Sequence, residues 1–311
     1  MTERAERTIF IEENSPRDGI QNETAPFSLR DRVTLIDALS GCGFQRIQIG
    51  AFVDPRRVPQ MDSMEELFDR IDKKPGVTYS ALVLNEKGME RALAVGLRHV
   101  SFFISASESH SRKNTSRSME DTLASAEKAI TRAKSRQVAV QGGIMNAFTC
   151  RFEGPILPDR VLGLVRSLLD MGVDEINLAD TAGLANPRQV ERLIHEVRHL
   201  TEKPIGLHLH DTLGFGLANV YAAWKAGVSR FDASCGGLGG CPFVPGVSGN
   251  IATEVLVHLF ESMDIRTGIS LSALHDVIGF LEGKVNRPLA GRVSSVRDQV
   301  PGAPASNPMR D

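Results

Sequence analysis

Short apolar runs alternate with longer amphipathic stretches along most of this chain. The short runs are rich in β-branched residues and are bounded by turn-forming residues, as is typical of buried strands. The longer stretches place apolar residues at i, i+3 and i+4, the spacing of one face of a helix. We predict strands at Thr8–Glu13, Phe44–Gly50, Val77–Leu84, His99–Ser105, Val138–Met145, Glu175–Asp180, Ile205–His210 and Arg230–Cys235.

The amphipathic stretches between these strands predict helices. They include Leu29–Leu39, Ser63–Ile71, Met119–Ala133, Asp159–Met171, Arg188–Leu200 and Leu217–Ala226, with an eighth helix near Asn250–Met263. Capping residues and first-turn prolines agree with these starts, at Ser28, Ser118, Pro158 and Pro187. Glycines suited to helix ends follow, at Gly43, Gly96, Gly172 and Gly227.

Eight strands that alternate with eight helices predict an α/β fold with a parallel sheet, because parallel neighbours need crossover helices. The count favours a closed (β/α)8 TIM barrel, and no GxGxxG follows the first strand to support a dinucleotide-binding fold. One more helix, Leu271–Val285, should pack on the barrel as a C-terminal extension. We expect a single domain over residues 1–293 and a disordered tail over 294–311.

Composition narrows the class of protein. The 311 residues are 41% hydrophobic, enough for one large core. A net charge of −2 without a basic stripe argues against nucleic-acid binding, and no apolar run approaches the roughly 20 residues of a membrane span. The polar start, Met1–Arg7, is unlike a signal peptide, so a cytoplasmic protein is expected. The four cysteines lack CxxC spacing, which argues against a disulfide framework or a structural zinc site.

In a barrel of this kind the chemistry lies at the carboxyl ends of the strands. Four such segments carry unusual residues: Pro16–Glu23, Asp180–Gly183, His208–Asp211 and the glycine-rich Gly236–Phe243. His208 and His210 share one face of a strand, because side chains alternate, and could share a metal. Each segment also has an ordinary interpretation: a surface ion pair, a helix-capping Asp180, two unrelated histidines, or an incidental thiol at Cys241.

Taken together, these segments resemble the 3-hydroxy-3-methylglutaryl-CoA lyase family, and the resemblance runs from about Phe10 to Val293. It rests on Arg17–Glu23, Phe52–Val53, Val58–Met61, His208–Thr212, Gly237–Pro242 and Ser248–Asn250. The glycine-rich cysteine loop is its most specific part. The resemblance implies a metal-dependent lyase that cleaves 3-hydroxy-3-methylglutaryl-CoA, an acyl-CoA thioester, to acetyl-CoA and acetoacetate. It also implies a homodimer.

The resemblance further implies a set of site residues. The metal ligands would be Asp18, His208, His210 and Asn250, a mixed nitrogen and oxygen set that suits octahedral Mg²⁺ or Mn²⁺. Arg17 would stabilise the enolate, Cys241 would act as acid or base, and His208 would combine ligand and catalytic roles. The remaining candidates are Gln48 and Asp180 for catalysis, and Arg17, Gln21 and Asn286 for substrate binding.

This chain also departs from the family pattern. Gln48 stands where the family has a glutamate, which removes one negative charge near Arg17; two serine positions are Ala51 and Asn177, and Thr24 replaces a lysine. These changes surround the pocket, so we expect a retained mechanism on an altered 3-hydroxyacyl-CoA. The alternatives are a citramalyl-CoA lyase, a lyase for an isoprenoid-extended homologue, a 4-hydroxy-2-oxoacid aldolase, or a weakened barrel that serves as a CoA-binding or partner-binding scaffold.

Overall fold

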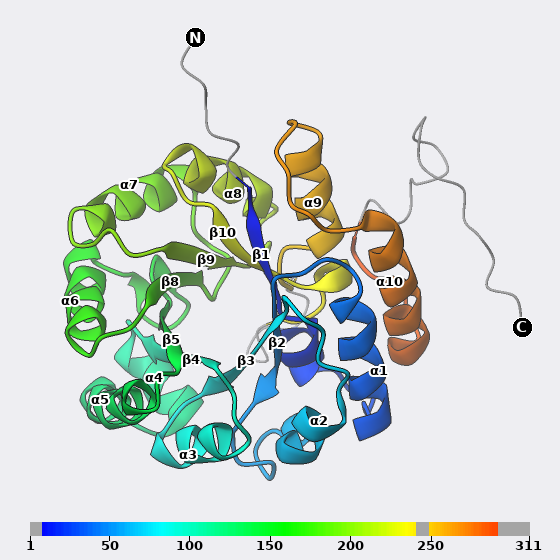
Figure 1. Cartoon of the computed structure of the whole chain (residues 1–311). Helices are drawn as coiled ribbons and strands as arrows, with labels where there is room; N and C mark the ends of the chain where they lie inside the picture. The colour runs from blue at the N-terminus through cyan, green and yellow to red at the C-terminus, as the bar shows by residue number, and fades with distance from the viewer. Residues whose placement is uncertain (1–7, 241–248, 292–311) are drawn as a thin grey trace, which may run out of the picture.

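The computed structural model describes residues 8–240 and 249–291, and within them the strands close into a parallel barrel (Figure 1). Around the barrel the strand order is β1-β10-β9-β8-β5-β4-β3-β2. The predicted TIM barrel and all of its predicted strands are confirmed. Their bounds are β1 Phe10–Glu13, β2 Arg46–Ala51, β3 Thr78–Val83, β4 His99–Ser105, β5 Ala139–Met145, β8 Glu175–Asp180, β9 Ile205–Leu209 and β10 Arg230–Ala233. A two-stranded hairpin, β6 Thr149–Cys150 and β7 Gly154–Pro155, follows β5.

Helices form a ring outside the strands (Figure 1). Their bounds are α1 Leu29–Ser40, α2 Met64–Arg70, α3 Glu86–Ala94, α4 Glu108–Thr115, α5 Met119–Ser135, α6 Pro158–Asp170, α7 Pro187–Arg198, α8 Gly216–Lys225, α9 Thr253–Glu261 and α10 Leu271–Val285. The C-terminal helix α10 packs against α1 and α9, as expected of an extension. No described helix is both long and apolar enough to cross a membrane. The tail predicted over 294–311 lies outside the described residues.

The predicted helix boundaries follow from local chemistry. Ser28 and Ser118 each begin a helix with a capping box, because their side chains accept a backbone N–H while Asp31 and Asp121 bond back. Gly43, just after α1, has a φ of +97°, and a Cβ there would lie 2.2 Å from the Gly268 carbonyl oxygen. Glycine is therefore required at that turn.

The barrel interior is polar, whereas the apolar core lies between the strands and the helices. Ile11, Ile47 and Ile49 are fully or almost fully buried beneath the helices. Inside the barrel, the Arg46 guanidinium pairs with Glu12 at 2.7 Å and with Glu175 at 2.6 Å. Buried charges persist only when they are paired in this way, so the interior is a hydrogen-bonded network rather than an apolar plug.

Two buried glutamates fasten the glycine-rich segment after β10 to its neighbours. Glu13 accepts hydrogen bonds from the Cys235 amide at 3.3 Å and from the Thr253 hydroxyl at 2.6 Å. Glu254, near the start of α9, accepts from the Gly236 amide at 3.0 Å. Burial raises the pKa of Glu254 to about 7, because a charged carboxylate is poorly solvated there.

We predict that Glu254→Gln removes a pH-dependent loss of stability. The folded state raises the pKa of Glu254 from 4.5 to about 7, so folding favours the protonated acid. Stability is then lost as the pH rises from about 4.5 through 7, by about 3 kcal/mol in total at about 1.36 kcal/mol per pKa unit. Glutamine cannot ionise, so urea unfolding between pH 5 and 8 should show a shallower decline for the variant. Parallel profiles for the two proteins would contradict this assignment.

Candidate functional site

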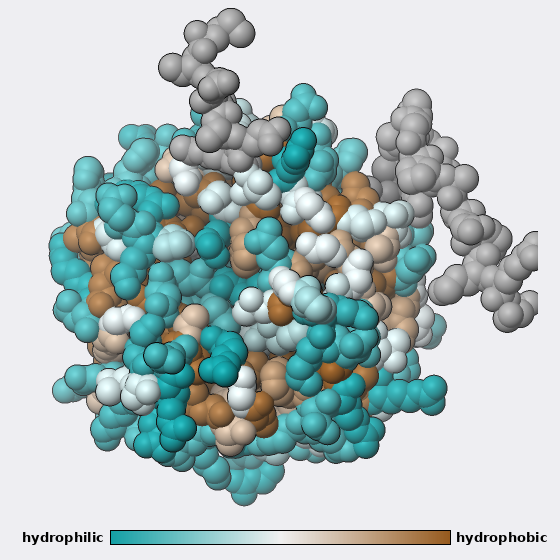
Figure 2. All heavy atoms as spheres, viewed as in Figure 1, coloured by the Kyte–Doolittle hydropathy of each residue, from teal (hydrophilic) through white to brown (hydrophobic). Residues whose placement is uncertain are grey.

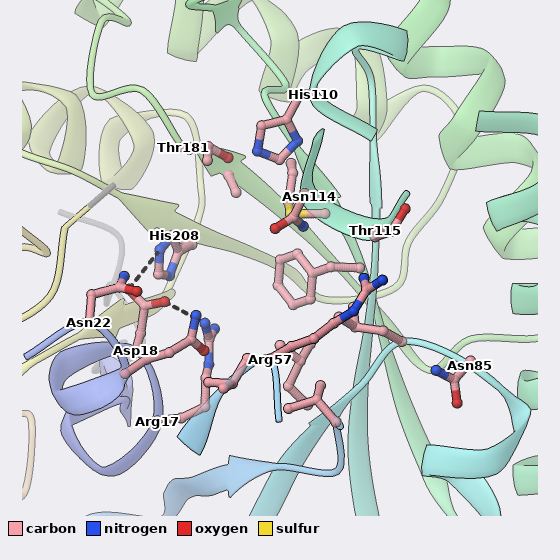
Figure 3. A pocket seen from close by; sticks show the side chains of 18 of the residues that line it. Arg17, Asp18, Asn22, Arg57, Asn85, His110, Asn114, Thr115, Thr181 and His208 are labelled. Carbon is pink, nitrogen blue, oxygen red and sulfur yellow. Dashed lines mark hydrogen bonds and ion pairs between the residues drawn. The ribbon is translucent and has the colours of Figure 1, made fainter. Parts of the chain in front are cut away.

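A cavity of about 560 Å³ opens at the carboxyl ends of the barrel strands (Figure 3). Its lining comes from the segments that follow β1, β2, β4 and β8, and from the ends of β3, β5 and β9. In Figure 3, Arg17, Asp18 and His208 lie along one wall, and His110, Asn114 and Thr115 lie along another. Hydrophilic and hydrophobic residues are interspersed over the molecular face in Figure 2, and no single apolar patch spans it.

Three metal-ligating side chains converge in this cavity. Asp18 lies in η1 (Ser15–Gly19), a single π-helical turn after β1, and His208 and His210 lie in and directly after β9. The two histidine Nε2 atoms are 3.1 Å apart, and Asp18 Oδ2 lies 3.9 and 3.8 Å from them. In the described part of the chain, this is the one group of three histidine, cysteine or acidic residues able to share a cation.

These separations fit an octahedral cation. Ligands at about 2.1 Å from Mg²⁺ stand roughly 3 Å apart when adjacent and roughly 4.2 Å apart when opposite. The separation of the two histidine nitrogens matches adjacent positions, and the distances from Asp18 fall between the two values. Small rotations of the aspartate would complete the geometry, so these residues fit a divalent metal.

Asn250 lies beside this group, but its amide nitrogen faces Asp18. Its Nδ2 donates to Asp18 Oδ2 at 2.8 Å and to the Leu238 carbonyl at 2.9 Å. Its Oδ1 is buried and has no hydrogen-bond partner within residues 8–240 and 249–291. The acceptor oxygens of Asp18 and Leu238 determine that the nitrogen of the Asn250 amide faces them. As an oxygen ligand, Asn250 would have to rotate its amide.

Arg17 and Asp18 form a buried ion pair next to the histidines. The Arg17 Nη1 donates to Asp18 Oδ1, and its Nε donates to Gln48 Oε1. Burial opposes ionisation of Asp18, but the Arg17 guanidinium and the two imidazoles hold the pKa of this carboxyl well below its ordinary value. Asp18 is therefore a carboxylate, the form that binds a metal.

A second carboxylate, which the sequence analysis missed, supports His208 from inside the barrel. Asp232 Oδ2 lies 3.3 Å from His208 Nδ1 and accepts from the Asn177 amide at 3.1 Å. A carboxylate behind a ligating histidine fixes the ring and its tautomer. The sequence did contain a sign of this residue, because side chains alternate along β10: Asp232 and Arg230 face the barrel interior and Phe231 points outward.

The other predicted site residues do not all line the cavity. Gln21 lines the cavity. Asp180 is buried, and its carboxylate accepts from the Leu184 and Ala185 amides at 3.1 and 3.0 Å, so it supports the loop after β8 and does not line the cavity. Burial raises its pKa. Asn286 is exposed just beyond the end of α10, outside the cavity lining. Cys241 lies outside the described residues.

His110 and Phe103 were not anticipated. His110 in α4 lines the cavity and its Nδ1 lies 3.1 Å from the Ser105 hydroxyl. Burial lowers its pKa to about 4, so the imidazole is neutral at pH 7. The Phe103 ring fills the space beside Gly143, where a Cβ would lie 2.3 Å from it. No spacing in the sequence singled out either residue, because both follow from the shape of the cavity.

A second cavity of about 760 Å³ adjoins the first and shares Val53, Asp54, Asn85 and Arg117 with it. Basic side chains outnumber acidic ones in its lining: Arg56, Lys87, Arg91, Arg117 and Lys128 against Asp54, Glu86 and Asp121. Asn85 caps α3, and the first turn of that helix also lines this cavity. The second cavity therefore offers positive side chains and a helix amino terminus, both of which favour anions.

The glycine-rich segment passes close to two of the candidate metal ligands, Asp18 and Asn250. Gly239 has a φ of +102°, and a Cβ there would lie 2.5 Å from Asn250 Nδ2 and 3.0 Å from the Asp18 carbonyl oxygen. Only glycine lets the backbone pass at this distance.

Comparisons with known proteins show which family the chain resembles. Residues 8–280 match the HMGL-like family model. The chain is 38% identical to a hydroxymethylglutaryl-CoA lyase of Bacillus subtilis, over 92% of this chain and 96% of that protein. It is 39% identical to an (R)-citramalyl-CoA lyase of Chloroflexus aurantiacus, over 94% and 96%. A solved HMG-CoA lyase of Acinetobacter baumannii, in complex with coenzyme A and 3-methylmalate, is 36% identical with a TM-score of 0.92, and the match covers 98% of this chain and all of that one.

We predict that His210→Ala weakens Mn²⁺ binding by about 100-fold or more, because it removes one of the converging donors and supporting partners alone are worth about 10- to 100-fold. Titration calorimetry measures the affinity directly. His110→Ala is the matched control, since it makes the same substitution in the same cavity away from Asp18. Unchanged Mn²⁺ affinity in His210→Ala would remove this residue from the ligand set.

Proposed function

Because this chain belongs to the HMGL-like family of carbon–carbon lyases, we propose that it uses Mg²⁺ or Mn²⁺ to cleave a 3-hydroxyacyl-CoA into acetyl-CoA and a ketone fragment. The observation that carries the proposal is the convergence of Asp18, His208 and His210 beside the Arg17 guanidinium. The parent substrate of the family, 3-hydroxy-3-methylglutaryl-CoA, would give acetoacetate.

Asp18, His208 and His210 would hold the cation, with Asn250 as a fourth ligand. When bound, the cation would lower the pKa of the substrate's 3-hydroxyl group. We propose Cys241, as a thiolate, to accept that proton. The carbonyl of the ketone then forms as the C2–C3 bond breaks, and the electron pair moves into the enolate of acetyl-CoA. Protonation of the enolate carbon completes the balance.

Arg17 is suited to stabilise the enolate. Its guanidinium is buried, and its bonds to Gln48 and Asp18 restrict its movement, so little reorganisation accompanies the appearance of negative charge. We assign protonation of the enolate carbon to Cys241, carried by the glycine-rich segment. His208 is also a candidate base, but a ring nitrogen that ligates a cation has no lone pair left to accept a proton.

The acyl group is where we propose a difference from the parent substrate. Ala51 and Asn177, which were expected to surround the pocket, do not line the first cavity, and Asn177 donates to Asp232 inside the barrel. That cavity adds Leu82, Phe103 and Met145 to its polar groups. An apolar wall of this kind suits a 3-hydroxyacyl group with a different substituent. The relative named for (R)-citramalyl-CoA shows that such divergence occurs at this level of identity.

The second cavity suits the phosphorylated nucleotide of CoA. That group carries several negative charges, and the cavity supplies Lys87, Arg117 and Lys128 beside an apolar Phe52 and Pro55. Because the two cavities share four lining residues, a thioester bound beside Asp18, His208 and His210 can extend into the second cavity.

The test is to identify products from a panel of 3-hydroxyacyl-CoAs. Mass spectrometry should find acetyl-CoA and the matching ketone only after Mg²⁺ or Mn²⁺ is restored to chelator-treated protein. The highest kcat/KM should belong to a substrate other than 3-hydroxy-3-methylglutaryl-CoA. If that thioester is best, the altered-substrate proposal is wrong. If no thioester is cleaved while Mn²⁺ and CoA still bind, the chain is a binding scaffold.

Each acyl group in the panel is also offered as its pantetheine thioester, which lacks the phosphorylated nucleotide. KM should rise for the shorter thioesters. Equal KM values would show that the second cavity does not hold the nucleotide.

We predict that Cys241→Ser lowers kcat by about 100-fold or more while KM changes little, because the serine hydroxyl is a much weaker acid than the thiol and proton transfer typically contributes about 10²- to 10⁴-fold. Cys150→Ser is the control, since it makes the same exchange at a buried thiol. Equal kcat values for Cys241→Ser and the parent would exclude the thiol from proton transfer.

A further inference from the structure

The residue that faces Arg17 from β2 is a neutral amide, and a buried carboxylate lies directly behind it. Gln48 Nε2 lies 3.5 Å from Glu12 Oε1 and donates to the Ser101 hydroxyl at 3.2 Å. Glu12 is fully buried and Gln48 is 1% exposed. Neither contact was evident from the sequence, where Glu12 was one acidic residue in the first predicted strand.

The partners of Gln48 determine which way its amide points. The Arg17 guanidinium can only donate hydrogen bonds, and an ionised Glu12 can only accept them. Gln48 therefore turns its oxygen to Arg17 and its nitrogen to Glu12. If the amide were flipped, its nitrogen would face the N–H donors of Arg17 and its oxygen would face the carboxylate oxygen of Glu12. Ser101 can donate or accept, so it does not select the orientation.

Other contacts fix the position of the Glu12 carboxylate. Arg46 Nε donates to its Oε2 at 2.7 Å, and the Ser80 hydroxyl donates to its Oε1 at 2.6 Å. This carboxylate is anchored to the barrel interior and does not line the cavity. Among its contacts, the one that leads to Arg17 is Gln48.

We propose that Glu12 is a positioning residue for Arg17 and acts through Gln48. The carboxylate that is missing at position 48 is present one layer deeper in the barrel, and the amide passes its orienting effect to the guanidinium. The catalytic consequence rests on the proposed lyase function, whereas the pairing of Glu12 with Gln48 does not.

The family pattern alone would predict that Gln48→Glu raises activity, whereas the nearby Glu12 predicts that it lowers activity. Gln48→Glu would restore the family residue next to Arg17, but it would also place a second carboxylate within about 3.5 Å of Glu12 in a buried site. Two such groups repel each other strongly. Moving the charge, with Glu12→Gln and Gln48→Glu together, keeps one carboxylate and one amide in contact.

The experiment is a double-mutant cycle on the full chain with the best thioester of the panel. Each single substitution should lower kcat by about 10- to 100-fold with little change in KM, because a displacement of about 1 Å at a reacting group costs about 10²-fold. The double variant should recover to within about fivefold of the parent. Ser101→Ala is the control: it removes a hydrogen bond from Gln48 Nε2 without changing charge, and because Ser101 does not select the amide orientation, its kcat should stay near that of the parent.

Melting temperatures separate this proposal from the proposed function. Both single variants should melt below the parent, and the double variant should regain most of the loss, even if no thioester is cleaved. Losses in melting temperature and kcat that add in the double variant would overturn the proposal. If Glu12→Gln does not fold, Gln48→Glu decides alone: a lower kcat supports the proposal, and an unchanged or higher kcat overturns it.

Discussion

The site depends on holding a carboxylate between a guanidinium and two imidazoles. Asp18 contacts Arg17 and lies within 3.9 Å of both histidine Nε2 atoms. The Arg17 guanidinium and hydrogen bonding to His210 outweigh the cost of burying the Asp18 carboxylate and hold its pKa well below its ordinary value. The π-helical turn after β1 and the alternation of β9 bring these groups together, and the close passage of Gly239 covers them. The carboxylate of Asp18 and the two imidazoles together suit a divalent cation.

The paired charges of the site continue into the barrel interior. Hydrogen bonds and ion pairs run from Arg17 through Gln48 and Glu12 to Arg46 and Glu175, and a second branch joins His208 to Asp232. A buried charge is tolerated only with a partner, so a change in one layer alters the demands on the next. Substrate chemistry and barrel stability therefore share residues, and a substitution inside this barrel should be assessed for both.

The shape of the cavity separates a common part of the site from a variable one. The ligand group and Arg17 lie on one wall, where a thioester and its 3-hydroxyl would meet the cation. Phe103 in β4 and the neutral His110 in α4 line the cavity on elements that carry none of the candidate ligands. A family that retains one reaction and varies the acyl group would be expected to diverge at such positions, since specificity depends on contacts that differ between substrates.

The sequence by itself determined the barrel, because hydrophobic periodicity, caps and glycines are local signals that each segment carries alone. No range was predicted for α3 and α4, for the hairpin β6–β7 or for the short turns η1, η2 (Pro59–Met61) and η3 (Cys235–Gly237). Motif resemblance also identified Asp18, His208 and His210, whose convergence the structure confirms. Only the tertiary structure decided that Asp180 caps a loop, that Asn250 turns its nitrogen to Asp18, and that Glu12 and Asp232 support the site. The partner of a buried polar group depends on which strands are neighbours and in what register, and a closed barrel sets that through contacts between residues far apart in the chain.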